Sequence, residues 1–320
     1  MKSSHLLHKV INIFFDLLAI VIASLAFYIT IPIYSPQETI KLPKGSVTNT
    51  IRYLQQQGYP LSTIDTYLLV AIGQPKSGEL KIGKKTMSRL EFLYKLTSAT
   101  EAIDVITLIP GETLPIFLKD LAKKQHLNID KLNQSYEQFS PYPEAGILPD
   151  TYHLPKGIKE KNLIKFLVNF TEKRYKDLSQ THLQHYNPKE WQRYLTIASI
   201  VQKEAANKAE MPIVASVIYN RLKQAMPLQM DGTLNYGKFS HTKVTPKRIK
   251  EDKSGFNTYH HTGLPPYPVC SVSIEAIKAA LNPAKSDYLY FMKNAQGVHD
   301  FSRTYKEHLR NVARAKHHSK

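Results

Sequence analysis

The most hydrophobic part of the chain is residues 10–34, which carry a single charged side chain, Asp16. A helix that rises about 1.5 Å per residue needs about twenty residues to cross a bilayer core of about 30 Å. The stretch therefore predicts one membrane-spanning helix. A cleaved signal peptide is the alternative, because Ser24-Leu25-Ala26 resembles a cleavage site. The apolar run continues to Ile33, beyond the usual length of a signal core, so we expect an uncleaved anchor.

The charges on either side of this span indicate its orientation. Lys2 and Lys9 precede it, and positive residues are retained on the cytoplasmic side of a membrane. We therefore expect a cytoplasmic tail over residues 1–9, an anchor over residues 10–34 and the remainder of the chain outside the cell membrane.

Beyond a short polar linker, the pattern changes to short alternating strands and helices. Residues 38–100 predict a small α+β module, with strands at 40–42 and 80–82 and helices at 47–57 and 88–96, the second capped by Ser88. Residues 101–320 are expected to form a larger mixed α+β domain. It begins with a strand at 105–109, a turn at 110–113 and a helix at 114–124, and residues 156–176 read as a basic, solvated helical stretch.

Two helices are expected further on, at residues 188–206 and 210–224. The apolar stripe of the first includes Ile197, Ile200 and Val201, and Glu204 falls on the same face. A carboxyl group in apolar surroundings has a raised pKa, so it can stay protonated near neutral pH and act as a general acid. The alternative is a structural glutamate paired with Arg221 or Asn220 of the next helix.

Composition narrows the choice of partners and cofactors. The 320 residues include 43 Lys and Arg against 26 Asp and Glu, a formal charge of +17, which favours a polyanionic partner unless the excess is only a solvated surface. The one cysteine, Cys270, excludes an intramolecular disulfide and a cysteine-rich zinc site. The thirteen histidines lack metal-ligand spacing, so we expect no metal. The expected orientation and the lack of a recognisable nucleic-acid recognition motif argue against nucleic-acid binding.

Several short motifs occur in order along the second half of the chain. The stretch Ala198-Ser199-Ile200-Val201-Gln202-Lys203-Glu204 is followed by Asn220-Arg221-Leu222 and by Leu228-Gln229-Met230-Asp231-Gly232-Thr233. Further motifs are Phe256-Asn257-Thr258-Tyr259, Gly263-Leu264-Pro265-Pro266, Ala279-Ala280-Leu281-Asn282-Pro283, Tyr288-Leu289-Tyr290-Phe291 and His299-Asp300-Phe301, with Leu148-Pro149-Asp150-Thr151-Tyr152 ahead of them all. Together they resemble the endolytic murein transglycosylases, the YceG-like family.

The resemblance implies a role for each part of the chain. Residues 38–100 resemble the LysM-like peptidoglycan-binding module of that family, and residues 101–320 resemble its catalytic domain. The catalytic glutamate of the family falls on Glu204. Around it, the resemblance suggests sugar-contacting or orienting roles for Asp231, Gln229, Asn220, Tyr236, Asn257, Tyr259 and His299. The chain departs from the family at Gln202, where relatives often carry Glu, and at residues 267–273, where an Asn-Pro-Gly turn is usual.

The activity that the resemblance implies is lytic cleavage of peptidoglycan between N-acetylmuramic acid and N-acetylglucosamine. Glu204 would act first as acid and then as base, giving a 1,6-anhydro end without a cofactor. Peptidoglycan synthases are the implied protein partners, and the role is termination of nascent glycan strands at the cell membrane. Two alternatives stay open: a hydrolase that uses Glu204 with Asp231, and a membrane-anchored wall-binding protein without activity.

Overall fold

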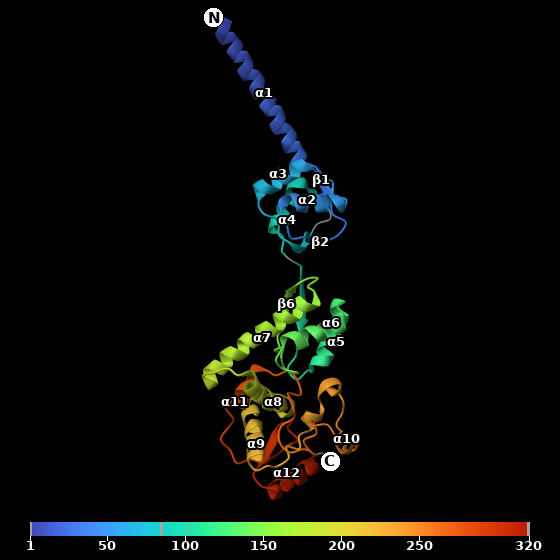
Figure 1. The fold of residues 1–320 in the computed structure, drawn as a ribbon, viewed down its shortest axis with the longest axis vertical. Helices are drawn as coiled ribbons and strands as arrows, with labels where there is room; N and C mark the ends of the chain where they lie inside the picture. Colours follow the sequence, from blue (N-terminus) through green and yellow to red (C-terminus); the bar gives the residue numbers. More distant parts are fainter. Residues whose placement is uncertain (1, 84–85, 101, 319–320) are drawn as a thin grey trace. The chain divides into compact units, whose positions relative to one another are not determined.

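The apolar stretch near the start of the chain forms one long helix, α1 (Lys2–Thr30), in the computed structural model (Figure 1). The structure describes residues 2–83, 86–100 and 102–318. Within α1, His8–Thr30 is long and apolar enough to cross a membrane, a test that a signal sequence near the amino terminus also passes. The predicted helix is therefore confirmed, and its role as an anchor stays a prediction.

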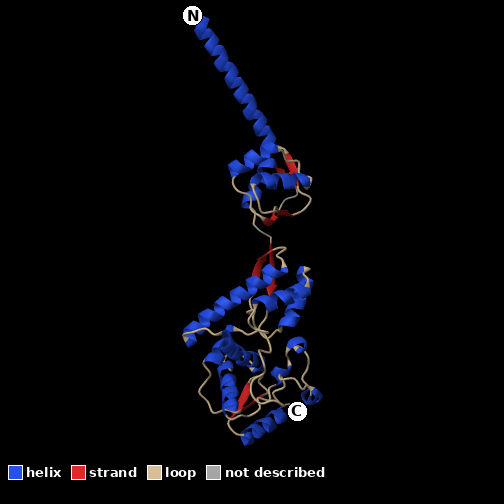
Figure 2. Cartoon of the chain, in the orientation of Figure 1, coloured by secondary structure: helices blue, strands red, loops and turns tan. Residues whose placement is uncertain are grey.

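The chain divides into two compact units, and the mixed α+β class is confirmed (Figure 2). The first unit contains the residues up to Val105 together with His153–Gly157. The second contains Ile106–Tyr152 and the residues from Ile158 onward. Strands β5 (Ile103–Thr107) and β6 (Thr151–Pro155) pair in one small sheet, and the chain passes between the units along both of them.

The first unit packs short helices against two pairs of strands. Strand β1 pairs antiparallel with β4, so that Ile33 lies opposite Met87, and β2 pairs antiparallel with β3, so that Ile40 lies opposite Leu80. All four of these side chains are buried in one hydrophobic core. Beyond α1, the elements are β1 (Pro32–Tyr34), β2 (Thr39–Leu42), α2 (Val47–Gln56), α3 (Thr63–Ile72), β3 (Gly78–Lys81), β4 (Thr86–Ser88) and α4 (Arg89–Ser98).

Helix starts in this unit follow local sequence signals. The hydroxyl groups of Ser46, Ser62 and Ser88 accept hydrogen bonds from backbone N–H groups in the first turns of α2, α3 and α4. The prediction that Ser88 caps a helix is confirmed. Helix α3 was not predicted, because its apolar residues occupy exposed as well as buried positions and so lack a one-sided pattern.

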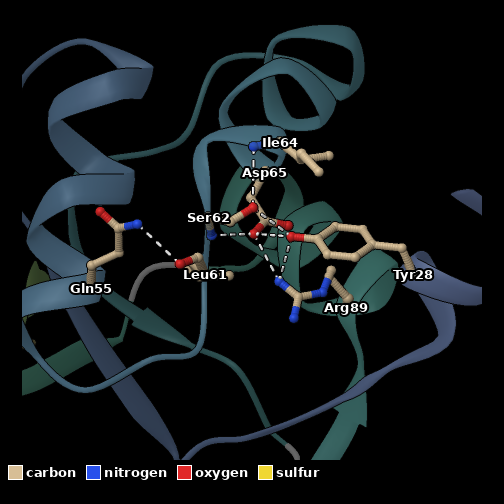
Figure 3. Close-up of polar contacts among 7 residues, drawn as sticks. All are labelled: Tyr28, Gln55, Leu61, Ser62, Ile64, Asp65 and Arg89. Carbon is tan, nitrogen blue, oxygen red and sulfur yellow. Dashed lines mark hydrogen bonds and ion pairs between the residues drawn. The ribbon is translucent and has the colours of Figure 1, made fainter.

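A buried ion pair joins the end of α1 to α3 and α4 (Figure 3). Arg89 Nη1 lies 2.7 Å from Asp65 Oδ2, and the residues are 4% and 0% exposed. The same carboxylate oxygen accepts from the Tyr28 hydroxyl at 2.8 Å and from the Ser62 N–H at 2.6 Å. The Arg89 guanidinium carbon lies 4.2 Å from the centroid of the Tyr28 ring. Three segments distant in sequence therefore share one buried charge pair.

The second unit has α8 (Pro188–Glu204) at its core, in contact with α9 (Met211–Lys223) and α11 (Ile274–Leu281). Helix α7 (Glu160–Leu183) was predicted as solvated, but Leu163, Leu167 and Tyr175 are buried on one of its sides. The lysines occupy the other sides and obscured this stripe. The remaining elements are α5 (Leu114–Gln125), α6 (Ile129–Phe139), α10 (Pro246–Glu251), β7 (Tyr290–Lys293), β8 (His299–Ser302), α12 (Tyr305–His318) and the 3-10 helices η1 (Asp231–Leu234) and η2 (Gly237–Phe239).

We predict that Asp65→Ala destabilises the first unit by about 3–5 kcal/mol, because Arg89 would stay buried without its counter-charge. Amide hydrogen exchange of α3 and α4 in the full chain measures the change. The matched control is Glu275→Ala, which removes the exposed Lys208–Glu275 pair of the second unit and should cost less than about 1 kcal/mol, as measured by exchange of α11. Equal effects of the two substitutions would contradict a structural role for the buried pair.

Candidate active site

Glu204 is the last residue of α8, and the sequence before it explains its position. Asn187 caps the helix by accepting hydrogen bonds from the N–H groups of Lys189 and Glu190, and Pro188 occupies the first turn. The following turns carry the fully buried Ile197, Ile200 and Val201. This packing fixes the helix in the core. The Glu204 side chain, at the end of the helix, lies at the edge of the core and is only partly exposed.

The Glu204 carboxylate is held by the backbone of the next motif. The Gly232 N–H donates to Glu204 Oε1 at 2.7 Å. A β-carbon at position 232 would lie 2.5 Å from Lys203 Cβ and 2.8 Å from Glu204 Oε1, so only glycine allows this approach. Among the residues that the structure describes, Oε2 has no hydrogen-bond partner. A proton on this carboxyl group would therefore reside on Oε2.

The environment of Glu204 raises its pKa to about 7. Removal of the carboxyl group from water is the largest cause, and the negative charge of Asp231 adds to it. The Gly232 N–H and the charges of His299 and Arg221 act in the opposite direction and only partly compensate. The group can therefore donate a proton and accept one near neutral pH.

The structural alternative for Glu204, a pairing with Arg221 or Asn220, is wrong. The Arg221 guanidinium donates to the carbonyl oxygens of Leu289 at 2.6 Å and Leu228 at 2.5 Å. The Asn220 amide donates to the carbonyl oxygens of Ser286 and Tyr288 at 2.8 and 3.0 Å. Both side chains therefore bind backbone carbonyl groups, and the Glu204 carboxylate is bound by the Gly232 N–H instead. A sugar contact by Asn220 stays a prediction.

Asp231 and Tyr259 form a second polar pair beside Gly232. The Tyr259 hydroxyl donates to Asp231 Oδ1 at 2.7 Å, and Asp231 is exposed. The Tyr259 phenol has a raised pKa because it is desolvated and bonded to a carboxylate, so it stays protonated. An acceptor and an aromatic ring next to an acid are suited to a sugar with several hydroxyl groups.

The loops that carry this pair are fixed by backbone contacts. Gln229 has a left-handed backbone with φ 48°, its N–H donates to the Thr258 carbonyl at 3.1 Å, and its side chain is exposed. The buried Asn257 amide donates to the carbonyl oxygens of Ile249 and Asp252, both at 2.7 Å. Asn257 therefore shapes the loop from within, whereas the Gln229 side chain remains available to a ligand.

The other two predicted site residues have partners in the fold. Tyr236 stacks on Phe256 with centroids 4.1 Å apart, and its hydroxyl donates to Asp252 at 3.3 Å. His299 Nδ1 lies 2.7 Å from Glu210 Oε2. Burial raises the pKa of Glu210, but hydrogen bonds from His299 and the Ala206 N–H outweigh it and lower the pKa overall. Sugar contacts by Tyr236 and His299 remain predictions.

Glu210 and a second buried acid, Glu144, were not identified from the sequence as residues of interest. Burial raises the pKa of Glu144 to about 7, although the N–H groups of Leu114 and Ala145 and the charge of Lys203 oppose the shift. Glu144 lies in a loop far from α5 in sequence yet caps that helix by binding Leu114. A turn rich in proline gave no signal for this contact.

The loop that departs from the family pattern is tied to α8. The Val269 N–H donates to Ser199 Oγ at 2.9 Å, and the Ser273 N–H donates to Gln202 Oε1 at 3.1 Å. The turn at 110–113 joins it, since the Gly111 N–H donates to the Ser271 carbonyl at 3.0 Å. Gln202 therefore supports the loop as an acceptor. In the described ranges, no group of three or more His, Cys, Asp or Glu is placed to hold a metal ion.

Comparison with known proteins identifies the family of the chain. The model of the YceG-like family matches residues 40–314, and the chain belongs to that family. It is 43% identical over 116 residues to the endolytic murein transglycosylase of Bacillus subtilis (strain 168), covering 36% of this chain and 32% of that protein. It is 29% identical over 242 residues to the protein of the same name from Streptococcus pneumoniae serotype 2 (strain D39 / NCTC 7466), covering 72% and 40%. The matched segments thus span about a third and two fifths of these relatives.

A solved structure supports the fold. The crystal structure of a putative YceG-like protein from Listeria monocytogenes superimposes with a TM-score of 0.56 at 24% sequence identity. The match covers 85% of this chain and 97% of that chain. The match of the family model over residues 40–314 confirms the resemblance to the YceG-like family that the sequence indicated.

We predict that Gly232→Ala destabilises the second unit by about 1–3 kcal/mol, because the added methyl group would overlap Lys203 and Glu204. Urea unfolding followed by Trp191 fluorescence measures the change. Gly255→Ala is the matched control, since its β-carbon would meet Pro266 at an ordinary 3.5 Å. If both variants unfold at the same urea concentration, a β-carbon at position 232 fits beside Lys203 and Glu204 without a clash.

We predict that Asp231→Asn lowers the pKa of Glu204, because the substitution removes a negative charge that disfavours its ionised form. An Asn side chain can still accept from Tyr259, which limits other changes. Carbon-13 NMR titration of labelled glutamate measures the pKa. Asp177→Asn, at an exposed position on α7, should leave it unchanged. A constant or higher Glu204 pKa in the Asp231 variant would show that the two carboxyl groups do not interact.

Proposed function

We propose that this chain is a membrane-anchored lytic transglycosylase that cuts peptidoglycan glycan strands between N-acetylmuramic acid and N-acetylglucosamine. The observation that supports it most is the Glu204 carboxyl group, with a pKa of about 7 and with Oε1 bound by Gly232. The relatives named endolytic murein transglycosylase add the substrate class.

In the proposed reaction, one carboxyl group serves both steps. Glu204 Oε2–H protonates the glycosidic oxygen while the bond between that oxygen and the anomeric carbon breaks. The carboxylate then takes the proton from the sugar 6-hydroxyl as O6 bonds to the anomeric carbon. The product is a 1,6-anhydro end, Glu204 is protonated again, and no water is consumed.

The residues around Glu204 supply the contacts that orient the sugar. Asp231, Tyr259 and Gln229 are at least partly exposed next to the Gly232 loop and are proposed to bind substrate directly. Asn220 and Asn257 are proposed to act by holding the loops, as their hydrogen bonds to carbonyl groups indicate. Tyr236 and His299 are proposed to border the site.

The other parts of the chain fit the same proposal. Helix α1 would hold the enzyme in the cell membrane with both units outside, and the module at residues 38–100 would bind the wall as a LysM-like domain. Release of nascent strands beside the membrane would bring the enzyme near peptidoglycan synthases, which are the proposed protein partners.

We predict that the full chain, in detergent or vesicles, releases anhydro-ended fragments from peptidoglycan and that Glu204→Gln abolishes this release. Mass spectrometry of the muropeptides separates the alternatives, because hydrolysis would add water and give reducing ends. Glu190→Gln, in the exposed first turn of the same helix, is the control that should retain activity. Reducing ends from wild type would indicate the Glu204 and Asp231 hydrolase. Strand binding without cleavage in every variant would indicate a wall-binding protein.

A further inference from the structure

Helix α3 of the first unit has an apolar outer side. Ile64, Tyr67 and Val70 recur every three residues and are 49%, 73% and 60% exposed. The opposite side is buried through Asp65 and Leu69. The helix therefore has its one charged side chain, Asp65, on the side that faces the core and apolar side chains on the side that faces outward, which is unusual for a surface helix in water.

The start of α3 is fixed to the end of the apolar helix α1. Tyr28, two residues before the end of α1, has its hydroxyl 2.7 Å from Ser62 Oγ, the cap of α3, and donates to Asp65 at 2.8 Å. The Arg89 side chain binds the same carboxylate, and the Arg89 backbone N–H donates to the Ile31 carbonyl at 2.9 Å. Figure 3 shows Ile64 in the first turn of α3, next to this network. The first turn of α3 and the exit of α1 therefore lie at the same level.

We propose that the outer side of α3, with Ile64, Tyr67 and Val70, lies in the interfacial layer of the membrane that α1 crosses. This inference rests on the proposed anchoring by α1. A span of 23 residues is about 35 Å long, slightly more than a bilayer core of about 30 Å, so Tyr28 reaches the lipid headgroups. A helix of ten residues whose first turn is bonded to Tyr28 then starts in the headgroup layer.

The chemistry of α3 suits a lipid surface. Its single charged residue, Asp65, is buried and neutralised by Arg89, so no unpaired charge opposes contact with lipid. Apolar side chains enter the boundary between headgroups and acyl chains, and tyrosine is enriched there because its ring is apolar and its hydroxyl polar. Leu90, which follows Arg89 and is 42% exposed, adds an apolar residue on α4 close to the same network. The bilayer is the proposed occupant because the face adjoins the exit of the span.

The test measures how deep residue 67 lies in a membrane. The full chain with Tyr67→Cys is labelled with an environment-sensitive fluorophore and reconstituted in vesicles of phosphatidylethanolamine and phosphatidylglycerol. The native Cys270 is fully buried, so the label goes to the introduced cysteine. The matched control is Lys41→Cys, an exposed position on β2. Figure 1 shows β2 at the end of this unit away from α1.

We predict blue-shifted emission and several-fold stronger quenching by spin-labelled lipid at position 67 than at position 41. Tyr28→Phe, which removes the hydrogen bonds to Ser62 and Asp65, should reduce that quenching. Equal, water-like signals at both positions in a chain that floats with the vesicles would overturn the docking and leave the anchor standing. A chain that does not float would overturn both, and glycan cleavage measured on the same samples reports separately on the enzyme.

Discussion

The contact between the Gly232 backbone and the Glu204 carboxylate governs the geometry of the candidate site. It brings the end of α8 and the start of η1 closer than any residue with a β-carbon would allow. The loop after Gln229 is in turn held by Thr258, whose hydroxyl accepts from the Met230 N–H at 3.1 Å. Glu204, Asp231 and Tyr259 thus take their positions from backbone contacts, and their side chains remain available for chemistry.

Glu204 shares its raised pKa with a second acid of the same unit. The pKa values of Glu204 and Glu144 are both raised to about 7, chiefly by burial. A carboxyl group whose pKa is higher in the folded than in the unfolded state stabilises the fold fully below its unfolded value of about 4.5. That contribution is lost as pH rises through about 7. An acid kept ready to give a proton therefore costs stability at neutral pH.

Much of the fold could be predicted from periodicity and caps, and the failures have physical causes. The helices around Glu204 were predicted within two residues because α8 and α9 bury continuous apolar stripes. The strand predicted at 105–109 lies at Ile103–Thr107, because a run of apolar residues does not set the register with its partner. Glu204 could be selected from its helical face. The hydrogen bonds of Asn220 and Asn257 to carbonyl groups could not be predicted, because the identity of an amide residue does not show which distant backbone group it binds.

The chain crosses between the units along β5 and β6, and this limits where the protein can be divided into fragments. Residues His153–Gly157 belong to the first unit although they lie between segments of the second. They are tied there by the Lys156 N–H, which donates to the Ala102 carbonyl at 2.8 Å, and by the Lys156 side chain, which pairs with Glu79 at 3.0 Å. A fragment that begins after Val105 would keep this segment but lose every partner it has in the first unit. The chain therefore passes between the units three times, after Val105, after Tyr152 and after Gly157. A proteolytic cut after Val105 would leave the residues before it held by their non-covalent contacts with His153–Gly157.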